Sequence, residues 1–242
     1  MRELQKHINH RTMITFLDLE GTQFSHEMIA IGAVKVSLKK DGSIRKIHKG
    51  YYSLVKPKNK IGKVVVDLTH IKEEDVKKYG KPFRVVISDL KKYLGREFTK
   101  TLWITFGNHD QRILAQSLAY NLDAPKEDVQ LMIKHSFDFS EFTANFVRDE
   151  NSNTYSLANL LKLYGVEFKG TQHNALADAL NLAYLYQAFI DRQDVTKVEY
   201  KKVLVKQKHL PEPVHKLLVS LLSENKAVTP EDIDESIEEY LR

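Results

Sequence analysis

Hydrophobic and polar positions in the first third of the chain predict a run of β-strands. Residues 13–20 (MITFLDLE) and 28–38 (MIAIGAVKVSL) are rich in apolar and β-branched side chains, and residues 44–55 follow with partial alternation. The Asp41-Gly42 dipeptide between the second and third segments is typical of a hairpin turn. We therefore expect these three segments to form a strand meander.

Helical and strand patterns alternate along the next part of the chain. In residues 82–94, apolar side chains recur at the spacing of an amphipathic helix. Residues 174–190 form a longer helical pattern that is apolar on nearly all sides. Strands followed by alternating strands and helices indicate a layered α/β domain, which we expect to contain five strands and to end near residue 192. Further helices are predicted at 110–120 and 154–165, and further strands at 101–106 and 133–139.

Composition changes after residue 192. Lysines predominate over residues 195–208 and acids over residues 231–242, and an amphipathic helical pattern, PVHKLLVSLLSEN, lies between them. We predict one domain at 1–192 and a small helical extension at 193–242. The apolar face of the intervening helix would pack either on the core or on a partner, which includes a second copy of the chain.

Bulk composition narrows the class of protein. The chain has 242 residues, of which 42% are hydrophobic and 29% charged, as in ordinary soluble globular proteins. No apolar stretch is long enough to span a bilayer, and the N-terminus lacks the apolar region of a secretory signal. The absence of cysteine excludes disulfides and thiolate metal sites and fits a cytoplasmic location. The net charge of +5 favours a polyanionic partner such as nucleic acid, although a soluble lysine-rich surface explains it equally well.

Two acids interrupt the first predicted strand. Asp18 and Glu20 are two residues apart in FLDLEGTQF, and side chains at that spacing point to the same face of a strand. Two neighbouring carboxylates repel each other unless a positive group joins them. We therefore looked for other oxygen or imidazole ligands that a shared cation would need.

The long helical pattern at 174–190 supplies one candidate. Between Ala175 and Tyr186, only Asp178 and Asn181 are strongly polar. A buried aspartate is costly unless it is paired or bound to metal, although a helix cap or a distant salt bridge would also satisfy it.

His173 and Asp110 complete the set of candidates. His173 lies five residues before Asp178 and is a candidate general base, or alternatively an ordinary surface histidine. Asp110 follows the predicted strand 101–106, so it is either a helix cap or a site residue at the carboxyl edge of the sheet.

Taken in order, these motifs resemble the DEDDh branch of the DEDD, or DnaQ-like, 3′-to-5′ exonucleases over roughly residues 12–190. The first motif is Asp18-Leu19-Glu20-Gly21-Thr22 and the third is HNALADA, with His173 and Asp178. The second, TFGNHD, is similar to the W-G-x-x-D form. That form occurs in exoribonucleases that trim histone messenger RNA and small RNAs, and in KapD-like bacterial proteins. Phe106 replaces the tryptophan, whereas Gly107 and Asp110 match.

The resemblance implies a fold, cofactors and residue roles. The fold would be RNase H-like, with a five-stranded mixed sheet flanked by helices. Two divalent ions, Mg²⁺ or Mn²⁺, would be held by Asp18, Glu20, Asp178 and Asp110, and His173 would take a proton from the attacking water. The enzyme would hydrolyse terminal phosphodiesters and release nucleoside 5′-monophosphates. Predicted contacts with the substrate are Gly21, Thr22, Phe24 and Met28, although Phe24 and Met28 equally suit simple core packing.

Four functions remain open from the sequence. The W-G-x-x-D resemblance favours single-stranded RNA or short nucleic-acid ends as the substrate. A DNA exonuclease with a proofreading or end-trimming role is the nearest alternative. A nucleic-acid-binding module without catalysis, or an interaction protein that acts through residues 193–242, belongs to a different class.

Overall fold

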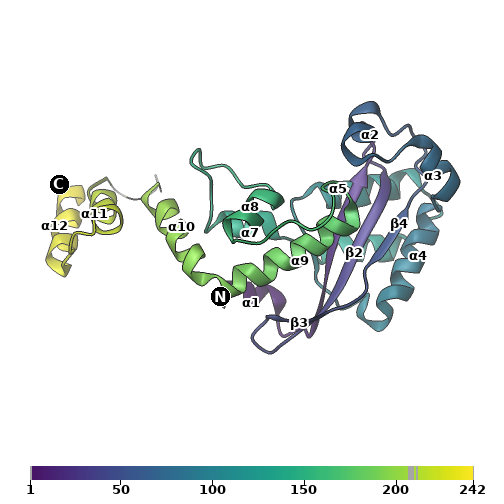
Figure 1. The fold of residues 1–242 in the computed structure, drawn as a ribbon. Helices are drawn as coiled ribbons and strands as arrows, with labels where there is room; N and C mark the ends of the chain where they lie inside the picture. The colour runs from purple at the N-terminus through teal and green to yellow at the C-terminus, as the bar shows by residue number, and fades with distance from the viewer. Residues whose placement is uncertain (1, 207–209, 211, 242) are drawn as a thin grey trace. The chain divides into compact units, whose positions relative to one another are not determined.

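The computed structural model describes residues 2–206, 210 and 212–241, and the chain divides into two compact units (Figure 1). The first unit comprises Met1–Glu141 and Ser156–Asp191, and the second comprises Phe142–Tyr155 and Arg192–Arg242. Each unit is described separately below.

A six-stranded mixed sheet forms the centre of the first unit. The strand order is β3-β2-β1-β5-β6, and β4 also pairs with β2. The first four strands form antiparallel pairs, whereas β5 runs parallel to β1 and β6 parallel to β5. The carboxyl ends of β1, β5 and β6 therefore meet at one edge of the sheet. The strands are β1 (Met13–Gly21), β2 (Met28–Leu38), β3 (Ile44–Ile47), β4 (Tyr51–Leu54), β5 (Trp103–Thr105) and β6 (Ser136–Asp138).

The strand count corrects the prediction of five. The predicted strand at 44–55 is divided into β3 and β4, both of which pair with β2. Gly50 lies at the interruption, where an added Cβ would come within 2.4 Å of Leu176 Cδ1. The division therefore coincides with a close tertiary contact, whereas the predicted mixed α/β class is confirmed.

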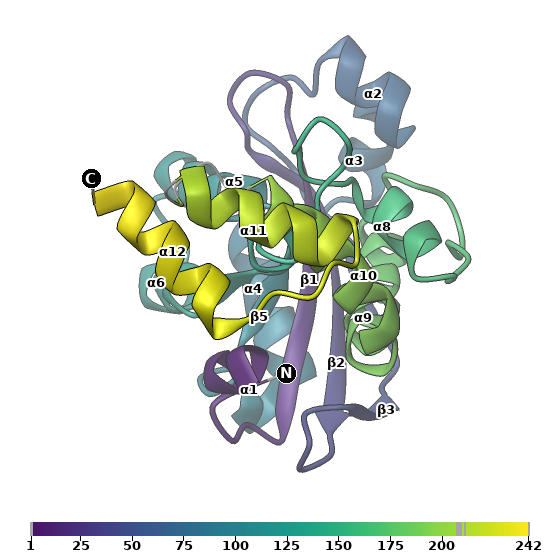
Figure 2. The same ribbon diagram turned by 90° about the vertical axis from the view of Figure 1, so that its left-hand side faces the viewer.

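Helices cover both faces of this sheet, as the two views in Figures 1 and 2 show. On one face, α4, α5 and α6 contribute Val86, Leu90, Ile113 and Met132 to the main hydrophobic cluster. On the opposite face, α9 contacts β1 and β2. The helices of this unit are α1 (Arg2–Ile8), α2 (Lys63–Thr69), α3 (Glu73–Tyr79), α4 (Phe83–Leu94), α5 (His109–Tyr120), α6 (Lys126–Lys134), α8 (Leu157–Leu163) and α9 (Ala175–Asp191), with a 3₁₀ turn at Gly95–Glu97.

Side chains of β1 alternate between these two layers. Leu17 and Leu19 belong to the cluster formed with α4, α5 and α6. Phe16 instead contacts Tyr186 of α9, with ring centroids 5.4 Å apart. Because alternate residues of a strand share a face, Asp18 and Glu20 lie on the α9 side of the sheet.

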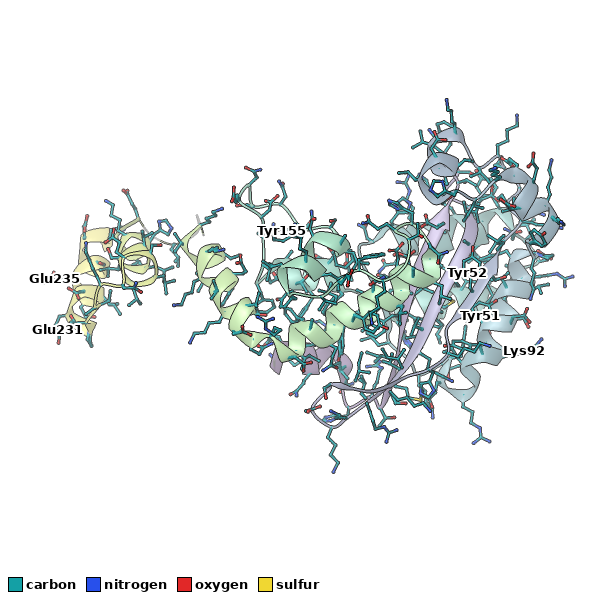
Figure 3. The ribbon with its side chains drawn as sticks, in the orientation of Figure 1. Tyr51, Tyr52, Lys92, Tyr155, Glu231 and Glu235 are labelled. Atoms are coloured by element: carbon teal, nitrogen blue, oxygen red, sulfur yellow. The ribbon has the colours of Figure 1, made fainter. Side chains whose placement is uncertain are left out.

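Gly32 permits the close approach of α9. It pairs with Asp18 across β1 and β2, and an added Cβ would lie only 2.1 Å from the carbonyl oxygen of Ala175. The first turn of α9 therefore rests directly on the backbone of β2 beside Asp18. On the opposite face of the sheet, the Tyr51 hydroxyl (labelled in Figure 3) donates to the carbonyl of Val86 at 3.2 Å and ties β4 to α4.

The second unit is helical. It contains α10 (Gln193–Val205), α11 (Glu212–Ser223) and α12 (Pro230–Leu241), together with the end of α7 (Phe139–Ala144). The helical character predicted for residues 193–242 is thus confirmed for the described residues. In Figure 3, Glu231 and Glu235 mark α12, and Tyr155 marks the other segment of this unit.

Residues 142–155 join this unit through contacts that the sequence did not indicate. Phe146 and Tyr200 have ring centroids 5.4 Å apart, and Lys206 Nζ donates to the carbonyl of Glu150 at 2.7 Å. Among the described residues of the whole chain, no helix has the length and apolar character needed to cross a bilayer.

Candidate metal-dependent active site

Three carboxylates from two elements converge at the edge of the sheet. Asp18 and Glu20 extend from β1, and Asp178 extends from the first turn of α9. One oxygen from each lies within 4.8 Å of the others. All three side chains are partly buried. The structure therefore assembles the triad that the first and third sequence motifs predicted.

The electrostatics of this triad favour a cation. Burial, followed by the charges of Asp110, Glu20 and Asp178, raises the pKa of Asp18 well above its ordinary value. Burial and the charges of Asp178 and Asp110 raise the pKa of Glu20 to about 8. A divalent cation stabilises carboxylates that are buried and that repel one another. Oxygen-only ligands suit Mg²⁺ or Mn²⁺, so these residues fit the cofactor that the sequence predicted.

Asp178 differs from its two partners because a histidine opposes the shift. Burial raises the pKa of Asp178 to about 6, whereas the charge of His173 and its backbone N–H lower it. His173 itself is exposed, lines the same pocket and has a φ of 62° in the turn before α9. Its imidazole is thus available at the carboxylate site, as a general base requires.

Asp110 lies beside the triad. It is buried in the first turn of α5, where its Oδ1 accepts a hydrogen bond from the Leu19 N–H at 2.8 Å. Burial raises the pKa of Asp110 to about 7, and the hydrogen bond from Leu19 opposes that shift. Its charge raises the pKa of both acids on β1, so the structure brings all four predicted acids into one electrostatic group.

Asp138 positions the turn that carries Asp110. Its Oδ1 accepts hydrogen bonds from the backbone N–H groups of Gly107 (2.9 Å), Ser140 (2.9 Å) and Glu141 (3.1 Å). One carboxylate oxygen therefore caps α7 and fixes the turn after β5. The sequence analysis missed this residue, and its signal was an aspartate directly after a strand and before a helix, as in SFDFSEF.

Asn181 has a similar role for His173. It is fully buried in α9, where its Oδ1 accepts from the Lys169 N–H at 2.9 Å and its Nδ2 donates to the Lys169 carbonyl at 2.8 Å. This two-point attachment fixes the loop that leads to His173. The buried polar residue noted in the sequence is thus explained by a backbone contact and not by a metal.

A pocket of about 500 Å³ opens beside the acids. Asp18, Glu20, Asp178 and His173 occupy one part of its lining, and the rest combines apolar and aromatic side chains with a few polar ones. Once cations neutralise the acids, a site of this kind next to apolar side chains suits a group with a charged phosphate and an aromatic base. The lining that the sequence analysis did not assign to substrate includes Val65, Leu68 and Thr69 of α2, together with Phe106, His109 and Phe168.

The four residues predicted to contact the substrate lie at different places relative to the pocket. Gly21 lines the pocket. Thr22 is buried, and its hydroxyl accepts from the Glu27 N–H at 2.9 Å and bonds to the Ser25 hydroxyl at 2.7 Å. Phe24 is 81% exposed and lies outside the pocket lining, so its contact with a base stays a prediction.

Met28 packs in the core. Its side chain is 1% exposed and lies in the same cluster as Leu17, Leu19 and Ile113. Leu19 and Ile113 also line the pocket, whereas Met28 lies outside the lining, so its contact with a base stays a prediction. Core packing, the alternative considered for Met28, is what the structure shows.

Comparison with known proteins identifies the family. The RNase T exonuclease family model matches residues 15–186, which is more than half of the chain. No curated protein matches the sequence.

Solved structures agree on the fold. The nuclease domain of 3′hExo bound to rAMP is 18% identical, with a TM-score of 0.60, 76% of this chain covered and 94% of that one. A 3′-exonuclease that recognises the histone mRNA stem-loop is also 18% identical, with a TM-score of 0.59 and coverages of 75% and 83%. Exonuclease I of E. coli with a dT13 oligonucleotide is 16% identical, with a TM-score of 0.57 and coverages of 82% and 45%.

The likeness to these neighbours agrees with the RNase H-like α/β fold predicted from the sequence. The likeness to 3′hExo, a DEDDh family member, agrees with the branch that the sequence motifs resemble. The family match spans the motifs that carry all four acids and His173. The chain therefore belongs to the RNase T exonuclease family and is a hydrolase.

Proposed function

We propose that this protein removes nucleotides one at a time from the 3′ end of single-stranded RNA and releases nucleoside 5′-monophosphates. The observation that carries the proposal is the triad of Asp18, Glu20 and Asp178, whose oxygens lie within 4.8 Å of one another beside a pocket of nucleotide size. Family membership supports the reaction class, and the triad supports this part of the sheet edge as the site of the reaction.

The donor set fits two divalent cations. Asp18, Glu20 and Asp178 would hold one ion, and Asp18 with Asp110 a second, with Mg²⁺ or Mn²⁺ as the candidates. When bound, the ions would neutralise the carboxylates and stabilise charge on the attacking and leaving oxygens of the phosphodiester.

Side chains of this protein would orient the substrate and remove a proton from the attacking water. His173, which is exposed beside Asp178, would accept a proton from the attacking water. The hydrogen bond from Leu19 and the cap formed by Asp138 would hold Asp110 and its turn in place. The apolar lining from α2 and Phe168 would hold the terminal base and exclude water from it.

RNA is favoured as the substrate by two similar structures. One contains rAMP and another recognises a histone mRNA stem-loop, and the second motif of this chain resembles the W-G-x-x-D form of exoribonucleases. DNA is the second candidate, because exonuclease I binds a dT13 oligonucleotide with a similar fold. We also propose that residues 193–242 bind a partner or a second copy of the chain, which the amphipathic α11 segment supports. A cytoplasmic location is a further proposal, which the cysteine-free sequence supports.

One experiment tests activity, direction and substrate together. Single-stranded RNA and DNA of matched sequence, labelled at either end, are incubated with Mg²⁺, Mn²⁺ or EDTA. We expect metal-dependent shortening from the 3′ end, faster on RNA and abolished in Asp18→Asn. The matched control is Asp234→Asn, which changes an exposed acid on α12 and should retain full activity. A well-folded protein that cleaves neither nucleic acid would refute the proposal, and faster cleavage of DNA would establish the second candidate.

A further inference from the structure

Two histidines and an arginine gather at the α5 side of the pocket. His109 and Arg112 are three residues apart in the first turns of α5, so they occupy neighbouring positions on one helix face. His26 approaches His109 edge-on, with ring centroids 5.3 Å apart and an interplanar angle of 69°. The turn that carries His26 is closed by its backbone N–H, which donates to the Thr22 carbonyl at 3.2 Å.

This group carries positive charge without a matching acid. Arg112 is exposed and forms no ion pair with any acid in the part of the chain that the structure describes. Within the same described residues, neither imidazole forms a side-chain hydrogen bond. Burial, followed by the charge of Arg112, lowers the pKa of His26, so the arginine is close enough to act on that imidazole. Two imidazoles and a guanidinium without an acid partner are suited to bind a shared anion by charge-assisted hydrogen bonds.

The place of the group relates it to the substrate. His109 lines the pocket together with Asp18 and Glu20, whereas Arg112 lies one turn further along the exposed face of α5. A strand whose 3′-terminal nucleotide occupies the pocket must leave through the mouth with its next phosphate exposed. Guanidinium and imidazole groups are suited to bind that phosphate by charge-assisted hydrogen bonds.

We propose that His26, His109 and Arg112 form a phosphate site for the first phosphodiester upstream of the scissile bond. The proposal rests on the proposed exonuclease function and adds a second subsite to it. It explains how the enzyme would select a strand over a single nucleotide, because a mononucleotide has no upstream phosphate to occupy the site.

Two substrates isolate the contribution of this site. A short oligoribonucleotide has both phosphates, whereas the p-nitrophenyl ester of a nucleoside 5′-monophosphate has the scissile phosphodiester alone. For Arg112→Ala, we expect the ratio of kcat/KM on the oligonucleotide to kcat/KM on the ester to fall about tenfold, as for a lost contact of about 1.4 kcal/mol. Arg112→Lys should recover part of that ratio because it keeps the charge. The dependence of log kcat/KM on log salt should become shallower by about 0.7 in Arg112→Ala, which corresponds to one phosphate contact on a single strand.

The matched control removes an arginine elsewhere. Arg45 is exposed on β3, at the edge of the sheet, and Arg45→Ala should leave the ratio unchanged. An unchanged ratio in Arg112→Ala, or an equal fall on both substrates, would overturn the proposal. If the wild-type protein hydrolyses neither substrate, the exonuclease function fails instead. Fluorescence anisotropy of the labelled oligonucleotide in EDTA then tests the phosphate site. If the site exists, Arg112→Ala binds the oligonucleotide more weakly than Arg45→Ala does.

Discussion

Glu20 links the chemistry of the site to the stability of the protein. Its pKa in the folded protein is raised from 4.5 to about 8 by burial and by the charges of Asp178 and Asp110. Between those two values the folded state binds a proton that the unfolded state has released. The free energy of unfolding of the metal-free protein therefore falls as the pH rises through this window. We expect the midpoint of urea denaturation in EDTA to be lower at the upper end of the window than at the lower end.

The control for this prediction is Glu20→Gln, which removes the titrating group at nearly constant volume. The fall in the midpoint should be smaller in Glu20→Gln than in the wild-type protein, and Mg²⁺ should raise the wild-type midpoint at the upper pH. Identical pH profiles for the two proteins would contradict the assignment of this effect to Glu20.

Asp138 offers a test of positioning at the level of one oxygen. In Asp138→Ala, the N–H groups of Gly107, Ser140 and Glu141 lose their shared acceptor. We expect a destabilisation of about 1–3 kcal/mol, measured by urea denaturation, and a lower kcat because the turn before Asp110 is released. Asp138→Asn keeps one acceptor oxygen and should retain most of the stability and most of the kcat. If Asp138→Asn is as impaired as Asp138→Ala, the negative charge of Asp138 matters and the acceptor geometry alone does not explain its role.

At the residue scale, the sequence predicted what depends on local spacing. The two-residue separation of Asp18 and Glu20 was sufficient to place both on one face of β1, and the structure confirms that pair. Met28 was left open between core packing and a substrate contact, because its distance from the motif along the chain does not tell which face of β2 it occupies. Asp138 was missed because its partner, the Gly107 N–H, lies 31 residues away.

Gly32 sets the position of a whole element. An added Cβ would overlap the backbone of Ala175 at 2.1 Å, and backbone of a helix cannot yield as a flexible side chain does. We expect Gly32→Ala to push the first turn of α9 away from β2, with a cost of about 1–3 kcal/mol measured by urea denaturation. Since α9 carries Asp178, the carboxylate triad should open and kcat should fall.

Metal binding separates this effect from a simple loss of stability. The rise in Tm that Mg²⁺ produces should be smaller in Gly32→Ala than in the wild-type protein, because one ligand has moved away from the other two. A variant that is less stable but keeps the full Mg²⁺ effect would show that the triad tolerates the displacement.

At the element scale, long periodic patterns were predictable and short or interrupted ones were not. The helices α4 and α9 were predicted within two residues of their bounds, because their apolar positions repeat over three or more turns. The predicted strand 133–139 begins inside α6, which continues to Lys134, and only Ser136–Asp138 pairs with β5. The division of 44–55 into β3 and β4 coincides with the contact between Gly50 and Leu176 of a distant helix, which no local pattern contains.

At the scale of the whole molecule, two questions are separate. One is whether the first domain ends at residue 192, and the other is to which unit residues 142–155 belong. Every residue that lines the pocket belongs to Met1–Glu141 or Ser156–Asp191. Residues 142–155, however, cluster with the C-terminal helices, through the Phe146–Tyr200 contact and the bond from Lys206 to Glu150. The sequence placed this segment inside the first domain because nothing in its composition marks the contact with α10.

Two truncations separate these questions. A chain that ends after Lys206 keeps α10 and both of its contacts with residues 142–155, whereas a chain that ends after Asp191 loses them. We expect the longer chain to retain the kcat/KM of the full-length protein and the shorter one to unfold at a lower temperature, because it exposes Phe146 and the segment around it. The unfolding temperature is measured by thermal denaturation, and kcat/KM is measured by hydrolysis of the oligoribonucleotide. Loss of kcat/KM in the stable longer chain would instead assign substrate delivery to α11 and α12, and equal stability of the two chains would place the domain boundary at 192 as the sequence predicts.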